Sequence, residues 1–229
     1  NNVGTIVEIG SGVDENVLGS KVATYGRHAR YVVARASDVR MIHRDIPDEQ
    51  AVFFTFAEIV MNGIRRGGLQ WGEAVAVYGL GLLGQLAVRI CRFAGARPVF
   101  ALDVSNGRLS RVEKHVGVVA LDPSKEGFRK LVGDRTHGRM VDVVLEVTGN
   151  AALIPAEFGI LREQGRFVVL SSPRGATLFN FHDLCNAGSY TIIGAHNKSH
   201  PRMESGDNPR SMKRDAERCL ALVADDEIS

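Results

Sequence analysis

The feature that most limits how this chain can fold is an apolar run that ends in three spaced glycines. Residues 74–84 read Ala-Val-Ala-Val-Tyr-Gly-Leu-Gly-Leu-Leu-Gly, a short buried strand that enters a GxGxxG pattern. Residues 85–93 continue with helical spacing, and a second apolar run, 98–102, leads directly to Asp103. Because strand, glycines, helix, strand and acid follow one another in this order, the stretch predicts a dinucleotide-binding βαβ unit.

Each glycine of the pattern has a separate physical role. Gly79 permits a tight turn, Gly81 lets the backbone approach a pyrophosphate, and Gly84 lets helix and strand pack closely. The helix start offers free N–H groups and a positive dipole end to phosphates, and Asp103 is placed to accept hydrogen bonds from a ribose. The alternative is a glycine-rich turn that binds nothing.

Length and composition place the chain among ordinary globular proteins of one or two domains. It has 229 residues, 45% of them hydrophobic and 24% charged, with a net charge of +2. The scattered basic residues do not favour nucleic acid or an anionic membrane as a partner. We find no run of roughly 18 apolar residues and no signal segment. Three cysteines without CxxC spacing fit free thiols of a reducing compartment, so we expect a cytoplasmic protein.

The beginning of the chain reads as an all-β segment followed by one helix. Short alternating runs predict strands at residues 3–9, 21–25, 29–34 and 39–42. A helix with apolar spacing is expected from Asp48 to Arg65, before Gly67-Gly68 ends it.

From Glu73 onward, apolar strands alternate with amphipathic helices, which predicts a parallel, doubly wound α/β sheet. A polar stretch with glycine and proline, residues 196–211, is expected to be a loop. After the first βαβ unit we expect helices at 107–115, 125–132, 151–161 and 212–224, and strands at 118–121, 140–146, 165–170 and 190–193.

Ligands of open α/β sheets bind at the carboxyl ends of the strands, and this rule selects the candidate cofactor-binding residues. They are Gly79, Gly81, Leu82, Leu83, Gly84, Asp103, Arg108, Val147, Thr148, Gly149, Ser171, Ser172 and Gly194. Asp103 favours NAD over NADP because a carboxylate repels a 2′-phosphate. Arg108 either stacks on adenine, pairs with a phosphate if Asp103 turns away, or is a solvated helix residue.

Six stretches, taken in their order along the chain, resemble a known superfamily. They are Gly4-Thr-Ile-Val-Glu-Ile-Gly10, Gly19-Ser-Lys-Val22, His28-Ala-Arg-Tyr-Val-Val33, Gly63-Ile-Arg-Arg66, the run Gly72–Gly84, and Glu146-Val-Thr-Gly149. This order is similar to that of the medium-chain dehydrogenase/reductase superfamily, which includes the zinc alcohol dehydrogenases.

The resemblance implies two domains and a cofactor between them. Residues 1–66 would be part of a GroES-like catalytic domain with its connecting helix, and residues 67–229 a Rossmann domain. Nicotinamide would lie in the cleft between the domains, and further strands would precede Asn1 and follow Ser229. A homodimer or homotetramer is expected.

The resemblance also raises the question of zinc. In the zinc alcohol dehydrogenases two catalytic ligands, a Cys and a His, precede the position of Asn1, and the third stands where this chain has Thr55. Neutral Thr is a poor zinc ligand, and no cysteine occurs between Val22 and His28, where the family's four-cysteine lobe would fall. We therefore expect a zinc-independent branch with no metal ligands in this chain. The alternative is that Glu58 completes a site with ligands before Asn1.

Four residues are candidates for the chemistry. Thr55, Glu58 and Asn62 share a helix face that the resemblance places beside the nicotinamide. Glu58 either handles the substrate proton or only caps or pairs near the interface, while Thr55 or Asn62 would hydrogen-bond the substrate. His196, after the last strand, is either an acid/base near neutral pH or a loop histidine without a catalytic role.

Together with the dinucleotide-binding pattern, the resemblance implies an oxidoreductase. It would transfer hydride between NAD(H) and a small-molecule alcohol or carbonyl substrate. The alternative from another class is a non-catalytic regulatory module that senses NAD(H), because a fold by itself does not settle activity.

Overall fold

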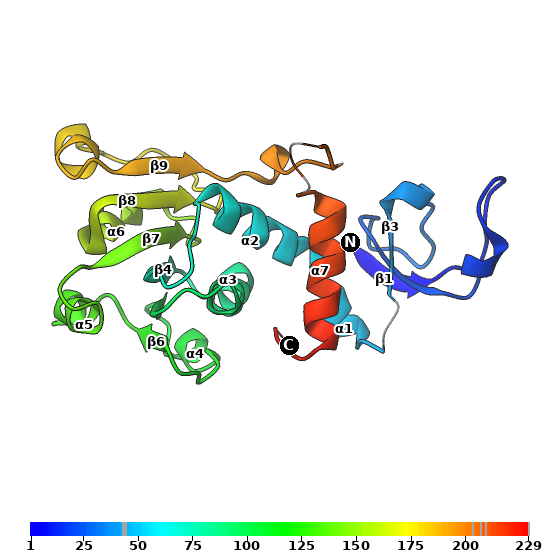
Figure 1. The fold of residues 1–229 in the computed structure, drawn as a ribbon, viewed down its shortest axis with the longest axis horizontal. Coiled ribbons are helices and arrows are strands. Elements are labelled where there is room, and N and C mark those ends of the chain that lie inside the picture. The colour runs from blue at the N-terminus through cyan, green and yellow to red at the C-terminus, as the bar shows by residue number, and fades with distance from the viewer. Residues whose placement is uncertain (43–44, 203, 207, 209, 229) are drawn as a thin grey trace. The chain divides into compact units, whose positions relative to one another are not determined.

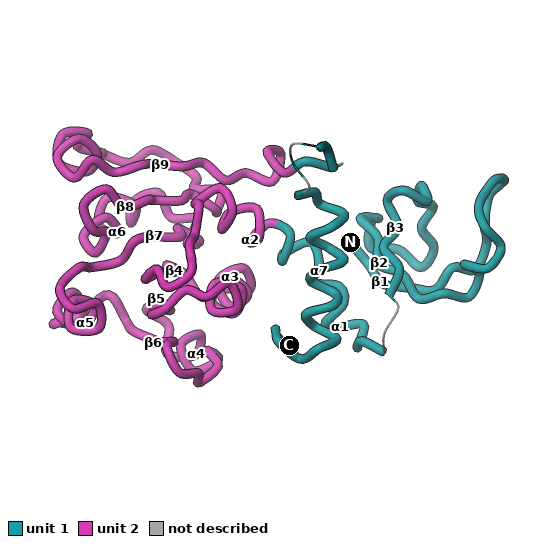
Figure 2. The backbone as a smooth tube through the Cα atoms, in the orientation of Figure 1, with its two compact units in different colours: residues 1–58, 201–229 teal, residues 59–200 magenta. Residues whose placement is uncertain are grey.

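The computed structural model describes residues 1–42, 45–202, 204–206, 208 and 210–228. Contacts within the chain divide it into two compact units, Asn1–Glu58 with Pro201–Ser229, and Ile59–His200 (Figure 2). These units differ from the expected domains 1–66 and 67–229 in two respects. The boundary lies inside a helix, after Glu58, and the last helix groups with the beginning of the chain.

The second unit contains a six-stranded parallel sheet with helices on it, which confirms the predicted α/β class (Figure 1). Its strand order is β6-β5-β4-β7-β8-β9. The strands are β4 (Val75–Tyr78), β5 (Val99–Leu102), β6 (Val118–Leu121), β7 (Val141–Glu146), β8 (Leu161–Val169) and β9 (Thr191–Gly194).

Burial on both faces explains why β4 and β5 are continuous apolar runs and why β7 is apolar apart from Asp142 and Glu146. Every residue of β4, β5 and β7 is buried. The register pairs Tyr78 with Leu102 on one side and with Glu146 on the other, so these strands end at the same edge. The chain runs outward from β4 to β5 and, in the opposite direction, from β7 to β8. The carboxyl ends of β4 and β7 therefore form the topological switch point where such sheets bind ligands.

The helices of this unit lie on both faces of the sheet. Phe158, from a short 3-10 turn, and Val132 of α5 pack on the face that presents Tyr78 and Phe100. Gly63 of α2 approaches Leu170 closely. The helices are the C-terminal part of α2 (Phe54–Arg66), then α3 (Leu82–Phe93), α4 (Asn106–Leu109), α5 (Phe128–Arg135) and α6 (Ile154–Glu157), with 3-10 turns at Ala151–Leu153, Phe158–Ile160 and Asn197–Ser199 and a π turn at His182–Asn186.

The first unit is a three-stranded antiparallel sheet with helices packed near it. The strand order is β1-β2-β3, and α7 packs on α1 and β3. The α7 helix has the predicted bounds, and its N-cap Ser211 accepts the Arg214 N–H at 3.2 Å. The elements are β1 (Asn2–Thr5), β2 (Lys21–Thr24), β3 (Val39–Met41), α1 (Asp48–Ala51) and α7 (Met212–Ala224), with 3-10 turns at Glu15–Val17 and Ala36–Asp38.

Three predictions about local structure were wrong. The expected strand 29–34 is irregular chain, because neither β1 nor β3 pairs with it and Val33 is 102% exposed. The strand expected over 3–9 ends at Thr5. The helix expected from Asp48 to Arg65 is two helices, α1 and α2, because the helical hydrogen-bond pattern is interrupted at Phe53. The next residue, Phe54, is buried, and its ring centroid lies 5.2 Å from that of Tyr25.

Other boundaries moved by a few residues. The helix expected at 107–115 ends at Leu109, while the helix after the glycines begins at Leu82 rather than at residue 85. The loop expected at 196–211 holds a 3-10 turn at Asn197–Ser199, and its residues 203, 207 and 209 lie outside the described part.

Candidate cofactor and active site

The glycine loop after β4 has the backbone geometry that its three glycines permit. Gly79 has a φ of +93°, in the region that favours glycine, and a Cβ there would lie 3.0 Å from the Thr148 backbone. A Cβ at Gly84 would lie only 1.8 Å from the Gly79 carbonyl oxygen. Both positions therefore exclude a side chain, and the loop is held tightly between α3 and the turn after β7.

The N-terminus of α3 points free N–H groups out of this loop. Gly81 is the N-cap residue, and within the described chain the N–H groups of Leu82, Leu83 and Gly84 have no hydrogen-bond partner. A Cβ on Gly81 would meet nothing within 4 Å, so the backbone there is open to a ligand. A 12-residue helix with open N–H groups at a sheet switch point fits the pyrophosphate of a dinucleotide.

Asp103 lies directly after β5 and is 6% exposed. Its Oδ2 accepts the Leu80 N–H at 2.8 Å, and its Oδ1 accepts the Ser105 N–H at 2.8 Å. The guanidinium of Arg108 lies 3.3 Å from Oδ2. Burial by itself raises the pKa of Asp103, but these two N–H groups and Arg108 outweigh it and hold the pKa below its usual value. The carboxylate therefore stays charged and ties the glycine loop to β5.

The structure places Arg108 beside Asp103, with part of its side chain exposed to solvent. Its side chain is about half exposed and pairs with Asp103, which does not turn away. Its carbonyl accepts the Gln85 side-chain amide of α3 at 3.0 Å. Arg108 is thus held beside the acid while its outer surface remains open to solvent.

Glu146 was missed by the sequence reasoning, although it is the last residue of a strand in which Asp142 is the one other charged residue. It is fully buried, and its Oε1 accepts the N–H and hydroxyl of Thr148 at 2.7 and 2.6 Å and the Gly149 N–H at 2.9 Å. Its Oε2 accepts the hydroxyl of Ser171. The signal in the sequence was a charged residue as the last residue of a strand that is apolar at most other positions, a placement that requires partners.

The remaining candidates at the strand ends are spread along the same edge. Val147 donates its N–H to the Tyr78 carbonyl at 2.9 Å, whereas Ser172 is exposed. Gly194 ends β9, and its carbonyl accepts the Arg66 Nε–H at 2.8 Å, which ties the end of β9 to α2.

In the first unit, Glu58 is buried and bound rather than open to solvent. It is 0% exposed, and its Oε1 accepts the Tyr25 hydroxyl at 2.5 Å. Arg40 lies on Tyr25, with its guanidinium carbon 5.4 Å from the ring centre. Burial raises the pKa of Glu58 from 4.5 to about 7, and the nearby charge of Asp215 adds to this, against the Tyr25 hydrogen bond and the charge of Arg40. Thr55 is half-buried at the start of α2.

Asn62 and His196 belong to the second unit and are linked there. The Asn62 side-chain amide donates to the Ser199 hydroxyl at 3.3 Å, and Ser199 donates to the His196 carbonyl at 2.8 Å. The exposed His196 ring accepts the Lys198 N–H on Nδ1 at 3.0 Å. In the neutral imidazole the proton is therefore on Nε2.

The described residues do not assemble a metal site. No group of three or more His, Cys, Asp or Glu side chains among them is arranged to hold a metal ion. Cys91 and Cys219 are buried free thiols, and burial raises the pKa of each to about 12. The donor set of a catalytic zinc, three His, Cys or carboxylate ligands, therefore does not fit the described part of the chain.

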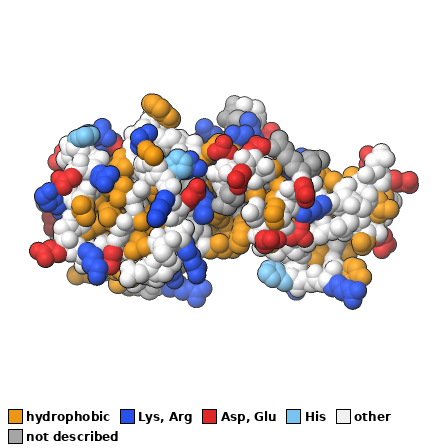
Figure 3. Space-filling model, turned by 90° about the horizontal axis from the view of Figure 1, so that it is seen from below, with side chains coloured by type: hydrophobic (Ala, Val, Ile, Leu, Met, Phe, Trp, Pro, Cys, Tyr) orange, Lys and Arg blue, Asp and Glu red, His pale blue; other side chains and the backbone are white. Residues whose placement is uncertain are grey.

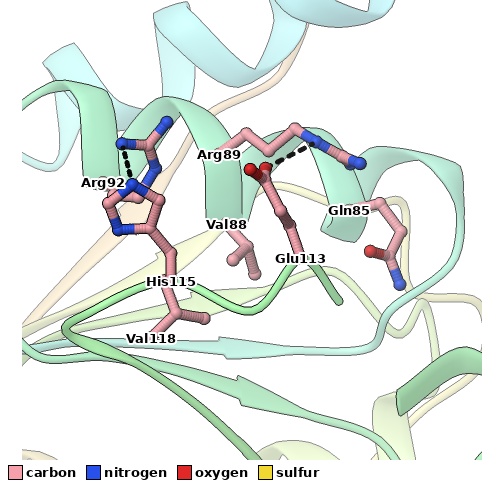
Figure 4. A pocket seen from close by; sticks show the side chains of 7 residues that line it. All are labelled: Gln85, Val88, Arg89, Arg92, Glu113, His115 and Val118. Atoms are coloured by element: carbon pink, nitrogen blue, oxygen red, sulfur yellow. Dashed lines mark hydrogen bonds and ion pairs between the residues drawn. The ribbon is translucent and has the colours of Figure 1, made fainter. Parts of the chain in front are cut away.

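Two cavities lie elsewhere in the second unit. One, of about 10 Å³, has room for about one water and lies between α3 and the segment leading to β6 (Figure 4). There Arg92 contacts His115 at 3.1 Å and Arg89 pairs with Glu113 at 3.7 Å. The other is a surface hollow of about 690 Å³ beside α5.

The surface and the helices add two observations on partners. Basic and acidic side chains are interspersed on the face drawn in Figure 3. Among the described residues, every helix is too short or too polar to cross a bilayer.

Comparison with known proteins identifies the family. The family model of zinc-binding dehydrogenases matches residues 83–207, more than half of the chain. D-guloside 3-dehydrogenase of Escherichia coli is 28% identical over 227 residues, covering 96% of this chain and 64% of that protein. L-threonine 3-dehydrogenase of a Shewanella species is 30% identical over 161 residues, covering 70% of this chain and 47% of that protein.

A solved structure supports the same assignment at the level of the fold. Galactitol-1-phosphate dehydrogenase of Escherichia coli is 19% identical, with a TM-score of 0.82, and the match covers 99% of this chain and 72% of that chain. The chain thus spans about two thirds or less of the length of the two curated relatives described above. Family model, sequence relatives and fold agree, and the chain belongs to the zinc-binding dehydrogenase family.

Proposed function

We propose that this chain is the larger part of an NAD-dependent dehydrogenase that interconverts a small hydroxyl-bearing substrate and its carbonyl product. The observation that carries the proposal is the open N-terminus of α3 beside a buried, charged Asp103. The names of the sequence relatives support the substrate class, since they are dehydrogenases of a guloside and of threonine. When bound, the nicotinamide cofactor supplies the hydride chemistry.

The binding roles follow from the contacts. The N–H groups of Leu82, Leu83 and Gly84 would bind the pyrophosphate, and the dipole of α3 would favour its negative charge. Asp103 would accept the adenosine ribose and oppose a 2′-phosphate, which is the basis for NAD rather than NADP. The exposed side of Arg108 would lie against the adenine.

The contacts favour His196 over Glu58 for handling the substrate proton. His196 is exposed and presents Nε2–H, whereas Glu58 is fully buried and its carboxylate accepts the Tyr25 hydroxyl. Thr55 is the better of the two candidates for hydrogen-bonding the substrate, because the Asn62 amide is 5% exposed and already bound to Ser199. We derive no step through zinc, since the described donors do not fit it.

Steady-state turnover tests this proposal. The protein is mixed with NADH and a panel of ketones, aldehydes and ketoses, and with NAD and the matching alcohols and polyols, while absorbance of NADH is followed. We expect turnover with at least one hydroxyl-bearing compound, and a loss of rate in the His196→Gln variant. If NADH binds tightly and nothing in the panel is turned over, the sensing module is the better description. If NADH does not bind at all, both functions are wrong.

A further inference from the structure

One buried carboxylate with many hydrogen bonds has no part in the proposed chemistry. Glu146, the last residue of β7, accepts four hydrogen bonds from three residues while fully buried. An ionised carboxylate only accepts hydrogen bonds, so this number of donors matches its capacity. A buried charge is costly unless it is paired or fully hydrogen-bonded, so such a site persists where the arrangement it creates is needed.

The donors come from the loops after two neighbouring strands. Thr148 and Gly149 follow β7, and Ser171 follows β8. The backbone of Ser171 also donates to the Glu146 carbonyl at 3.0 Å. Thr148 in turn lies against Gly79, whose Cβ position is 3.0 Å from the Thr148 Cα. One side chain therefore holds the loop after β7 and the loop after β8, whereas the glycine loop is tied separately to Asp103 through the Leu80 N–H.

The strand order says which half of a dinucleotide these loops would meet. Asp103, the ribose acceptor, follows β5 on one side of β4, whereas β7 and β8 lie on the other side. A dinucleotide with its pyrophosphate at the β4 loop and its adenosine ribose at β5 extends its second nucleoside over β7 and β8. The loops held by Glu146 are therefore on the nicotinamide side.

Glu146 has a carboxyl neighbour with which it does not share a hydrogen bond. Glu157 of α6 is buried, and within the described chain both of its carboxyl oxygens lack a hydrogen-bond partner. Burial, together with the charge of Glu146, raises the pKa of Glu157 to about 8. The hydrogen-bond donors of this region therefore face Glu146 and not Glu157.

We propose that Glu146 is a positioning residue that fixes the loops after β7 and β8 for the nicotinamide half of the cofactor. This inference rests on the proposed function. It predicts that loss of Glu146 weakens binding of the nicotinamide half of the cofactor and leaves binding of the adenosine half unchanged.

The test compares two ligands on the same protein. Dissociation constants are measured by titration for NADH and for ADP-ribose, which lacks nicotinamide, in the wild type and in Glu146→Ala and Glu146→Gln. In Glu146→Ala we expect NADH affinity to fall on the order of ten- to a hundredfold, the range seen when a residue that hydrogen-bonds to a metal ligand is removed. ADP-ribose affinity is expected to stay unchanged. Glu146→Gln keeps the shape and one acceptor oxygen, so its loss for NADH is smaller and in the same direction.

Asp142→Asn is the matched control. Asp142 lies on the same strand and is also buried, but its carboxylate binds the Ala74 N–H at 2.8 Å and the Arg162 Nε at 2.5 Å near the start of β7. This variant is expected to lower stability and to leave the ratio of the two affinities unchanged.

The outcomes separate this inference from the function on which it rests. If wild-type protein binds neither ligand, the proposed function fails. If wild type binds both, and the Glu146 variants weaken both equally or neither, the positioning role is wrong and the function stands. If Glu146→Ala does not fold, the affinity ratio in Glu146→Gln decides.

Discussion

Asp103 has two tasks, and a substitution there acts on both. Its oxygens hold Leu80 of the glycine loop and Ser105, and its charge faces the place where we propose the ribose lies. A change to a small residue would remove the charge and also release the loop. Asparagine is the sharper test because it keeps one oxygen as an acceptor.

We expect Asp103→Asn to bind NAD about ten- to a hundredfold more weakly, because charge-assisted hydrogen bonds contribute roughly 1.5 to 3 kcal/mol each. The preference for NAD over NADP should fall as well, since one negative charge that opposes the 2′-phosphate is gone. Titrations with both cofactors measure this. Asp122→Asn is the control, because Asp122 likewise accepts a serine N–H, from Ser124 at 2.9 Å, but after β6. Wild-type protein that binds NADP as tightly as NAD would contradict the assignment of Asp103.

Glu157 makes stability depend on pH. Its pKa in the folded protein is about 8, above the usual 4.5, because it is buried beside the charge of Glu146. A carboxyl group with a raised pKa stays protonated in the folded protein while it ionises in the unfolded chain. Its contribution is therefore fully present below pH 4.5 and is lost as the pH rises to about 8.

In this window the free energy of unfolding should fall by up to about 1.4 kcal/mol per pH unit on account of Glu157. Glu157→Gln removes this dependence, although Glu58, with its raised pKa of about 7, still contributes below that pH. Urea unfolding followed by circular dichroism from pH 5 to pH 8.5 measures the slope. Equal slopes in wild type and variant would show that the environment of Glu157 is described wrongly.

At the scale of elements, the turn between β4 and α3 contains one glycine, Gly84, that is needed for packing and another, Gly81, that we propose is needed for binding. Gly84 is close to the Gly79 carbonyl, so a methyl group there must displace backbone. Gly81 has ordinary backbone angles, with a φ of −67°, and open space at its Cβ position. The same substitution at these two positions therefore has different physical consequences.

We expect Gly84→Ala to lower the free energy of unfolding by roughly 1 to 3 kcal/mol, the range for overpacked sites, and to weaken NADH binding through the distorted turn. Gly81→Ala should leave stability unchanged yet weaken NADH binding, because its methyl group occupies the space proposed for the pyrophosphate. Thermal unfolding and NADH fluorescence titration, made on both variants, measure the two effects. Unchanged NADH affinity in Gly81→Ala would place the pyrophosphate elsewhere.

At the scale of the whole molecule, the described residues lack a ligand set for the zinc that gives the family its name. Position 55 holds threonine, and the described residues supply no set of three ligands. A zinc site would thus require donors from outside the described residues. The proton-transfer role proposed for His196 and the substrate-binding role proposed for Thr55 require no metal ion.

We expect the longest available form of the protein to carry far less than one zinc per chain and to keep its activity after treatment with a strong chelator. Metal analysis and activity before and after chelation measure this, with a zinc-dependent alcohol dehydrogenase treated in parallel. Stoichiometric zinc, with activity lost on chelation and restored by zinc, would contradict the zinc-independent mechanism and support a metal-assisted one.

Local patterns in the sequence determined much of the fold by themselves. The apolar runs of β4, β5 and β7 and the bounds of α7 were predicted because burial and helical spacing leave a record in neighbouring residues. The glycine pattern likewise predicted a turn that the structure contains, because φ and close packing at Gly79 and Gly84 constrain residue type directly.

Only the tertiary structure decided which polar groups meet. Tyr25 and Glu58 are 33 positions apart, and Glu146 and Ser171 are 25 apart, so no local pattern records either contact. The strand predicted at 29–34 failed for the same reason, because a strand forms only where another strand offers its backbone. Residue type and spacing therefore determined the elements and the cofactor loop, while pairing across the chain decided that Glu58 is buried and that Glu146 holds the loops.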